Sequence, residues 1–243
     1  MKYELRARLA AEFMGTAFLL AAVIGSGVMG ERLANGNVGL VLLANSIATG
    51  TALVALILAF GPISGAHMNP VVTLADAAQG GISWRDVPFY ILAQVVGAFA
   101  GVATAHLMFG LPLFFVSHHA RNGSALLWSE FVAAFGLLVV IWGCNRSRSS
   151  LVAFAVGAYI TAAYWFTGST SFTNPAVTLA RCASDTFAGI RPVDVPLFIL
   201  SQLGATLAAV LLFRAFPVGG LKSDQPSPAK DEGGHQAAPG CEY

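Results

Sequence analysis

NPVVTLA at residues 69–75 recurs as NPAVTLA at residues 174–180, with six of the seven positions identical. Each copy follows a short loop that contains glycine, serine or threonine, at residues 64–68 and at residues 168–173. Asparagine is favoured as a helix N-cap, and proline fits the first helical position because no hydrogen-bond donor is needed there. Each copy therefore predicts a loop that turns into a short helix at its Asn-Pro step.

The chain is more apolar than a soluble protein. Of its 243 residues, 56% are hydrophobic and only 10% are charged, whereas a soluble domain has about 25% charged residues. Five apolar runs reach the ~20 residues that cross a hydrocarbon core, and another, at 18 residues, is just within range. We therefore predict an all-α membrane protein with six transmembrane helices. The runs cover about residues 9–30, 38–63, 87–110, 125–144, 150–167 and 194–214.

The repeat extends to the spans around each heptapeptide. Glu12 in the first span corresponds to Glu130 in the fourth, and segments 88–94 and 196–202 both run from proline to glutamine. Each half holds three spans, so the halves enter the membrane from opposite sides and place a site near the midplane. The heptapeptide helices are too short to cross, and non-helical backbone at membrane depth is tolerated where it lines water. We predict an inverted repeat with two re-entrant half-helices along an aqueous pathway.

We expect one channel domain over residues 1–215, with repeat 1 at about 5–110 and repeat 2 at about 125–215. Residues 217–243 are polar and rich in proline and glycine, which predicts a disordered tail. Nine Lys and Arg residues on the side of the N-terminus, against four on the other, place both termini in the cytoplasm. A net charge of +1 gives no reason to expect nucleic acid, and three scattered cysteines suggest no disulfide framework.

Two Asn-Pro boxes at this spacing, each preceded by a Glu-bearing span, resemble the aquaporin and aquaglyceroporin family over about residues 5–215. The resemblance implies a passive channel in a lipid bilayer, a homotetramer with one pore per subunit, and neither a cofactor, a metal nor enzymatic activity. Both asparagines would donate hydrogen bonds into the pore, and the positive helix N-termini would oppose cations. The box residues are Asn69, Pro70, Val71, Asn174, Pro175 and Ala176.

The resemblance also gives roles to the two loops and to the two buried carboxylates. Backbone carbonyls in each loop would form a ladder of acceptors for a permeant that donates hydrogen bonds. Glu12 and Glu130 would accept hydrogen bonds from backbone N–H groups of the loops and hold the loops in place. The ladder residues are Gly65, Ala66, His67, Thr170, Ser171 and Phe172.

The selectivity filter of this family normally has an arginine directly after the second box, where this chain has Val177. Counting from the boxes places Thr49, Ala162 and Ser171 at the other filter positions, so the usual aromatic is missing as well. We expect a wider and less polar constriction. Arg181, one helical turn beyond Val177, would lie in the outer vestibule or, alternatively, face headgroups or a neighbouring carbonyl.

This filter resembles a bacterial branch of the family that is linked to arsenic-resistance operons. The resemblance implies a channel of the bacterial inner membrane that passes trivalent arsenite and glycerol-like solutes as well as water, with arsenic detoxification by efflux. One alternative is a mainly water-selective aquaporin. Another is an ion-coupled secondary transporter, because inverted repeats occur in that class too.

Overall fold

The computed structural model describes residues 3–147 and 149–216, and the tail expected at 217–243 lies outside them. Within the described residues the chain is helical and contains no strand. The α-helices are α1 (Leu5–Leu33), α2 (Val38–Ser64), α3 (Pro70–Ala78), α4 (Val87–Phe109), α5 (Ser124–Ser147), α6 (Val152–Phe166), α7 (Pro175–Arg181) and α8 (Val195–Ala215), with short 3-10 turns at Ser149–Leu151 and Pro192–Asp194.

Five helices, α1, α2, α4, α5 and α8, are long and apolar enough to cross a membrane. The fifth predicted span is shorter than expected, because α6 has 15 residues and follows a 3-10 turn. At ~1.5 Å per residue this helix is about 22 Å long, less than a ~30 Å hydrocarbon core. It ends because Thr167 adopts an extended conformation, with ψ 137°, and begins the second loop.

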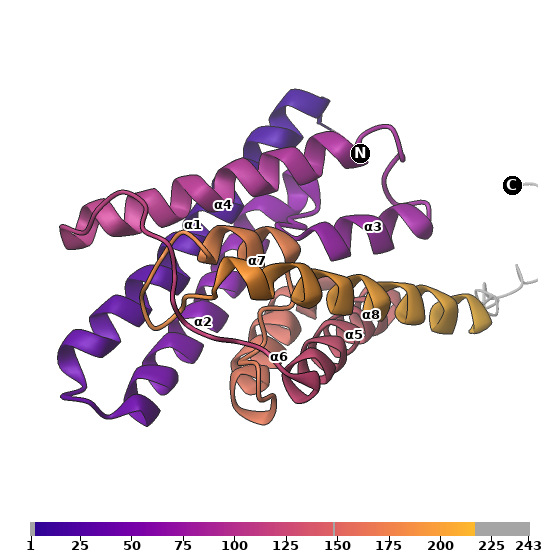
Figure 1. The fold of residues 1–243 in the computed structure, drawn as a ribbon. Helices are drawn as coiled ribbons and strands as arrows, with labels where there is room; N and C mark the ends of the chain where they lie inside the picture. The colour runs from indigo at the N-terminus through magenta and orange to yellow at the C-terminus, as the bar shows by residue number, and fades with distance from the viewer. Residues whose placement is uncertain (1–2, 148, 217–243) are drawn as a thin grey trace, which may run out of the picture.

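The two short helices start at the Asn-Pro steps, as predicted. The side chain of Asn69 accepts a hydrogen bond from the backbone of Val71, and α3 then runs for nine residues. Asn174 caps α7 in the same way through the backbone N–H groups of Ala176 and Val177, and α7 runs for seven residues. Both helices pack against α4 and α8, so each half-helix touches a long helix from either half of the chain (Figure 1).

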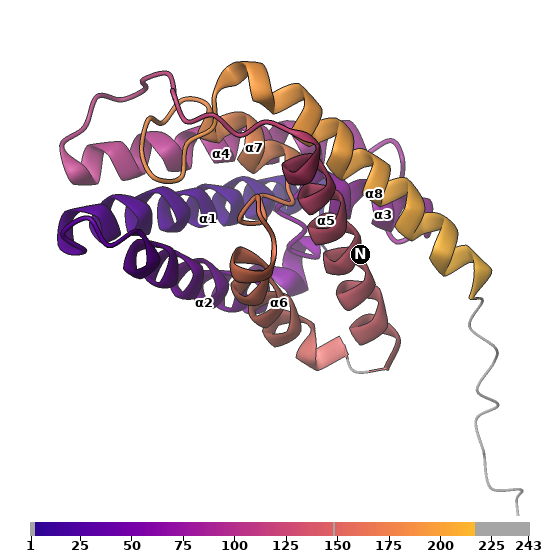
Figure 2. The ribbon, with the colours of Figure 1, turned by 60° about the horizontal axis from the view of Figure 1, so that its bottom comes forward.

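The long helices form two similar sets of three. In the first half α1 packs against α2 and α4, and in the second half α5 packs against α6 and α8 (Figure 2). Helices α2 and α6 join the halves at a close crossing. A Cβ on Gly50 would lie 2.7 Å from the carbonyl oxygen of Gly157, and a Cβ on Gly157 would lie 2.6 Å from that of Gly50. Glycine at both positions lets the two backbones meet, as is usual for helices packed in membranes.

Candidate functional site: a cavity between the repeats

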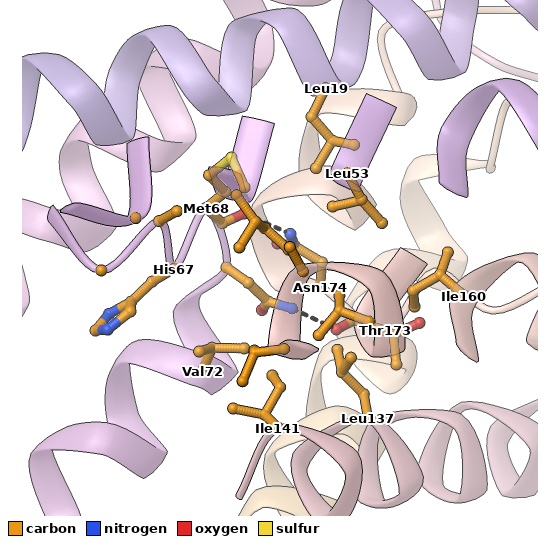
Figure 3. A pocket seen from close by; sticks show the side chains of 18 of the residues that line it. Leu19, Leu53, His67, Met68, Val72, Leu137, Ile141, Ile160, Thr173 and Asn174 are labelled. Atoms are coloured by element: carbon orange, nitrogen blue, oxygen red, sulfur yellow. Dashed lines mark hydrogen bonds between the residues drawn. The ribbon is translucent and has the colours of Figure 1, made fainter. Parts of the chain in front are cut away.

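A cavity of about 600 Å³ lies between the two halves and passes both asparagine boxes. One side is aliphatic: Figure 3 shows Leu53, Leu137, Ile141 and Val72 around Asn174. The other side is formed by the two loops that precede the short helices. An aliphatic wall opposite a wall of backbone polar groups suits small molecules that carry both hydroxyl groups and an apolar face.

The box asparagines tie the two loops to each other across the cavity. Nδ2 of Asn69 donates to the carbonyl oxygen of Thr173 at 2.8 Å, and Nδ2 of Asn174 donates to that of Met68 at 2.7 Å. Their side-chain oxygens accept from the first backbone N–H groups of α3 and α7. Because an amide NH₂ group has two donors, each asparagine keeps one N–H for a molecule in the cavity.

Glu12 is fully buried in α1 and binds the first loop. Its carboxylate accepts from the hydroxyl of Ser64 at 2.6 Å and from the backbone N–H groups of His67 at 2.9 Å and Met68 at 2.6 Å. Nε2 of Gln94 in α4 donates to it at 2.8 Å. Four donors offset the negative charge without a cation, since hydrogen bonds to a carboxylate stabilise its charged form.

Glu130 repeats these contacts in the second half. It is fully buried in α5 and accepts from the backbone N–H groups of Phe172 and Thr173, both at 2.9 Å. Nε2 of Gln202 in α8 donates to it at 2.7 Å. The two carboxylates therefore make the contacts with the loops that an anchoring role requires.

Both loops have residues in left-handed backbone conformations, which side chains with a Cβ seldom adopt. Ala66 and Met68 have φ of 48° and 47°, and Ser171 and Thr173 have φ of 53° and 55°. Conformations of this kind cost about 1–3 kcal/mol each, and they persist where the surrounding structure enforces them. Here the hydrogen bonds from Met68 and Thr173 to the buried carboxylates supply part of that constraint.

Five of the six predicted ladder residues line the cavity. Thr170 is the exception: it is not a lining residue, and its hydroxyl oxygen lies 3.5 Å from Nη1 of Arg121. His67 lines the cavity with its ring held between Thr73, at 3.1 Å from Nδ1, and Asp76, at 3.5 Å from Nε2. Three residues of the first loop and two of the second therefore line the cavity, and the carbonyl ladder itself stays a prediction.

Three of the four predicted filter residues, Thr49, Ser171 and Val177, line the cavity. The prediction for Ala162 is wrong, because this residue is exposed on the outer face of α6. Helix periodicity explains the error: two residues correspond to about 200° of rotation, so Ala162 faces away from the side of Ile160 and Tyr164. Both of these line the cavity.

Tyr164 changes the expected character of the constriction. Its hydroxyl lies 3.1 Å from the hydroxyl of Thr49, so α6 and α2 meet through a hydrogen bond beside the cavity. We expected a filter without an aromatic ring, and an aromatic ring lines the cavity after all. The filter therefore lacks the arginine but not the bulk of an aromatic side chain.

Arg181 faces the protein interior rather than headgroups. Its side chain is 2% exposed, lines the cavity, and donates from Nε to the carbonyl oxygen of Ala188. Its guanidinium carbon lies 3.4 Å from the centre of the Phe172 ring, which indicates a cation–π contact.

No sequence pattern pointed to Arg121, which lies in the connection between the halves. Its side chain donates to the carbonyl oxygens of Gly189 at 2.7 Å, Phe187 at 3.1 Å and Ser169 at 3.4 Å. Its backbone N–H donates to Asp194 at 2.7 Å, and burial lowers the pKa of its guanidinium. Arg121 thus joins the connection to both chain segments that flank α7.

Replacing Arg121 with methionine is expected to lower the free energy of unfolding by about 3 kcal/mol, because the substitution leaves buried carbonyl oxygens without charged donors. Thermal unfolding of the purified protein in detergent would measure this. Arg146→Met is the matched control, because Arg146 also donates to carbonyl oxygens, those of Phe216 at 3.1 Å and Phe213 at 3.4 Å, but at an exposed position. Equal losses for both variants would contradict the role given to Arg121.

Comparison with known proteins identifies a matching family and several relatives of this chain. The model of the family described as Major intrinsic protein matches residues 2–168. The aquaglyceroporin AqpS of Rhizobium meliloti (strain 1021) is 50% identical over 213 residues, which cover 88% of this chain and 91% of that protein. Aquaporin NIP1-4 of Oryza sativa subsp. japonica is 30% identical over 236 residues, which cover 92% and 82%.

The X-ray structure of the aquaglyceroporin from Plasmodium falciparum superposes with a TM-score of 0.65, covering 88% of this chain and 95% of that one. At 21% sequence identity this likeness shows the fold, and it confirms the predicted helical channel architecture. The relatives and the family match confirm the resemblance seen in the paired boxes. The chain belongs to the major intrinsic protein family and is a passive, multi-pass membrane channel for small neutral solutes, not an enzyme.

Proposed function

We propose that the constriction of this channel passes neutral solutes larger than water, namely trivalent arsenite and glycerol-like molecules, in addition to water. The observation that carries the proposal is Val177, which lies on the cavity wall directly after the second box, where the family normally has arginine. A valine occupies less of the cross-section than an arginine and adds neither donor nor charge. The cavity therefore keeps room for a solute with several hydroxyl groups.

The two walls of the cavity suit such a solute. Arsenite at neutral pH is an uncharged trihydroxy molecule, similar in size to glycerol, and its hydroxyl groups donate hydrogen bonds. The carbonyl oxygens of the loops accept such bonds, while the free N–H groups of Asn69 and Asn174 donate to the solute oxygens. The aliphatic wall around Leu137 and Ile141 faces the remaining surface of the solute.

We further propose that the channel lies in a bacterial inner membrane with both termini in the cytoplasm, and that it exports arsenite down its gradient. The excess of Lys and Arg on the side of the N-terminus supports the orientation. The 50% identity to a bacterial aquaglyceroporin supports the membrane and the solute class. Assembly as a homotetramer is a prediction from the family resemblance.

An ion-coupled transporter is less well supported, because such a protein needs carboxylates near the midplane that an ion can reach. Asp76, the carboxylate among the described lining residues, lies in the last turn of α3, away from the boxes and 3.5 Å from Nε2 of His67. Glu12 and Glu130 are fully buried, with four and three hydrogen-bond donors respectively. His106 is bound at both ring nitrogens, at 2.9 Å to the carbonyl oxygen of Leu113 and at 2.8 Å to the hydroxyl of Ser184. A mainly water-selective pore is favoured by one observation, the bonded pair Thr49–Tyr164 beside the cavity.

The kinetics of arsenite entry into liposomes that contain the purified protein test the proposal. A passive channel predicts an initial rate that rises linearly with arsenite concentration and does not change with membrane potential or with sodium and proton gradients. Saturation at millimolar arsenite together with dependence on an ion gradient would indicate a carrier. Protein-free liposomes give the background rate.

A further inference from the structure

We propose that Arg181 provides the cation and proton barrier of this pore, which Val177 at the usual filter position cannot provide. The inference deepens the proposed function, because it explains how a channel without a filter arginine still discriminates by charge. It rests on Val177 forming part of the constriction, and it assigns the electrostatic role to a residue one helical turn away.

The position of Arg181 follows from the helix that carries it. Arg181 lies four residues after Val177 in α7, so both side chains are on one face of the helix, and both line the cavity. The Arg181 side chain is held from two directions, by the carbonyl oxygen of Ala188 at Nε and by the ring of Phe172 below the guanidinium. A guanidinium fixed in this way cannot swing out of the pathway.

The terminal nitrogens of Arg181 are free toward the cavity. Among residues 3–147 and 149–216, the bond from Nε to Ala188 is the one hydrogen bond of this side chain. Neither terminal nitrogen is a buried atom without a partner, so both reach open space. Arg181 is thus a side chain that is 2% exposed, lines the cavity, and keeps its terminal donors available for hydrogen bonds.

No carboxylate of the described residues forms an ion pair with Arg181 or with the side chain of Arg121. Arg121 stacks on the same ring, with its guanidinium carbon 4.9 Å from the centre of Phe172. Glu130 attracts both guanidinium groups from a distance, while its direct partners are backbone and amide donors. Two positive charges therefore share the ring of Phe172, and of the two only Arg181 lines the cavity.

Fixed cations beside a narrow pathway with low-dielectric walls repel permeant cations strongly and leave neutral solutes unaffected. A water molecule that accepts a hydrogen bond from Arg181 is also oriented against passing a proton onward. Solutes with hydroxyl oxygens gain an additional donor at this point. Arg181 would accordingly favour neutral hydroxylated solutes over ammonium, sodium and hydronium ions.

The test compares Arg181→Met with Arg181→Lys in liposomes that carry a pH gradient, with proton leak and sodium flux measured beside glycerol flux. We expect the methionine variant to raise cation and proton permeability about tenfold, because a fixed positive charge without an ion pair is removed from the cavity wall. Glycerol flux should equal that of the wild type or exceed it. The lysine variant keeps the charge, so its proton and sodium permeability should remain as low as that of the wild type. Should the methionine variant fail to reach the membrane, Arg181→Gln removes the charge and keeps a donor.

Arg32→Met is the matched control. Arg32 makes the same kinds of contact, lying 5.0 Å from the ring centre of Phe109 and donating to its carbonyl oxygen at 2.7 Å, but it does not line the cavity. It should behave as wild type. Adding Val177→Arg to Arg181→Met returns a cation to the pathway and should restore the barrier.

The inference is overturned if the methionine and glutamine variants conduct glycerol while their cation and proton permeability stays as low as that of the wild type. It is also overturned if the lysine variant leaks as much as the methionine variant, because packing rather than charge would then be responsible. Absence of glycerol and arsenite flux in the wild-type protein is a different result and would contradict the proposed solute range instead.

Discussion

Val177→Arg should reduce arsenite and glycerol flux by about tenfold or more, which requires only ~1.4 kcal/mol of additional barrier, while water flux falls much less. Val177 is buried on the cavity wall, and the Thr49–Tyr164 pair lines the same cavity. An arginine at this position would extend a long side chain into the space that a triol needs. A single water molecule needs less width, so the ratio of solute to water permeability is the quantity to measure.

Val177→Met separates width from charge in the same assay. Methionine adds length without a donor or a charge, so it should reduce solute flux only partly. Equal losses of water and solute flux in Val177→Arg, or no loss of either, would mean that the constriction lies elsewhere in the cavity.

Glu130→Leu should abolish flux and lower the free energy of unfolding by several kcal/mol. The substitution leaves the backbone N–H groups of Phe172 and Thr173 and the amide of Gln202 without their acceptor. A buried donor without a partner costs about 1–3 kcal/mol. Thr173 would in addition keep a left-handed conformation, with φ 55°, after losing the bond that supports it.

Thermal unfolding in detergent and glycerol flux in liposomes would measure both effects. Glu31→Leu is the control, because Glu31 also accepts a loop N–H group, that of Phe187 at 3.1 Å, but at an exposed position. Glu12→Leu should be at least as severe as Glu130→Leu, since Glu12 has four donors. A Glu130→Leu protein as stable and active as the Glu31 variant would show that the carboxylate does not hold the loop.

The architecture could be predicted from the sequence because each Asn-Pro segment specifies its structure through neighbouring residues, and because the segment occurs in both halves of the chain. Each Asn-Pro step specifies its own cap and helix start, and the paired glutamates and glutamines occur at equivalent places in both halves. The structure places equivalent contacts there: Nε2 of Gln94 donates to Glu12, and Nε2 of Gln202 donates to Glu130. Because the glutamate and the glutamine recur together in each half, the sequence indicates that they are contact partners.

The filter could be predicted only in part, because it depends on where α6 ends. Gly168 follows the C-cap Thr167, but it does not determine the rotation of the helix, so counting back from Asn174 placed Ala162 rather than Tyr164 beside the cavity. A shift of two residues moves a side chain to nearly the opposite face of a helix. Hydrophobic residues on both faces of a membrane helix give little indication of which face lines a pore.

The two arginines at one end of the cavity were the least predictable feature. Arg121 belongs to the connection between the halves, which has no equivalent elsewhere in the chain. Its contacts with Gly189 and Ser169 lie 68 and 48 residues away in sequence. Arg181 lies closer in sequence to its partners Phe172 and Ala188, but the pattern of residues did not show that they would bury it.

The most direct test of a wide constriction with Val177 in place of the usual arginine is the ratio of arsenite to water permeability in one preparation of protein-containing liposomes, with ionic current recorded as a control. We predict arsenite and glycerol entry well above the rate in protein-free liposomes, beside water flux and without current. Water flux with arsenite and glycerol entry no faster than in protein-free liposomes would contradict this, and would show that Thr49 and Tyr164 narrow the pore to the width of water.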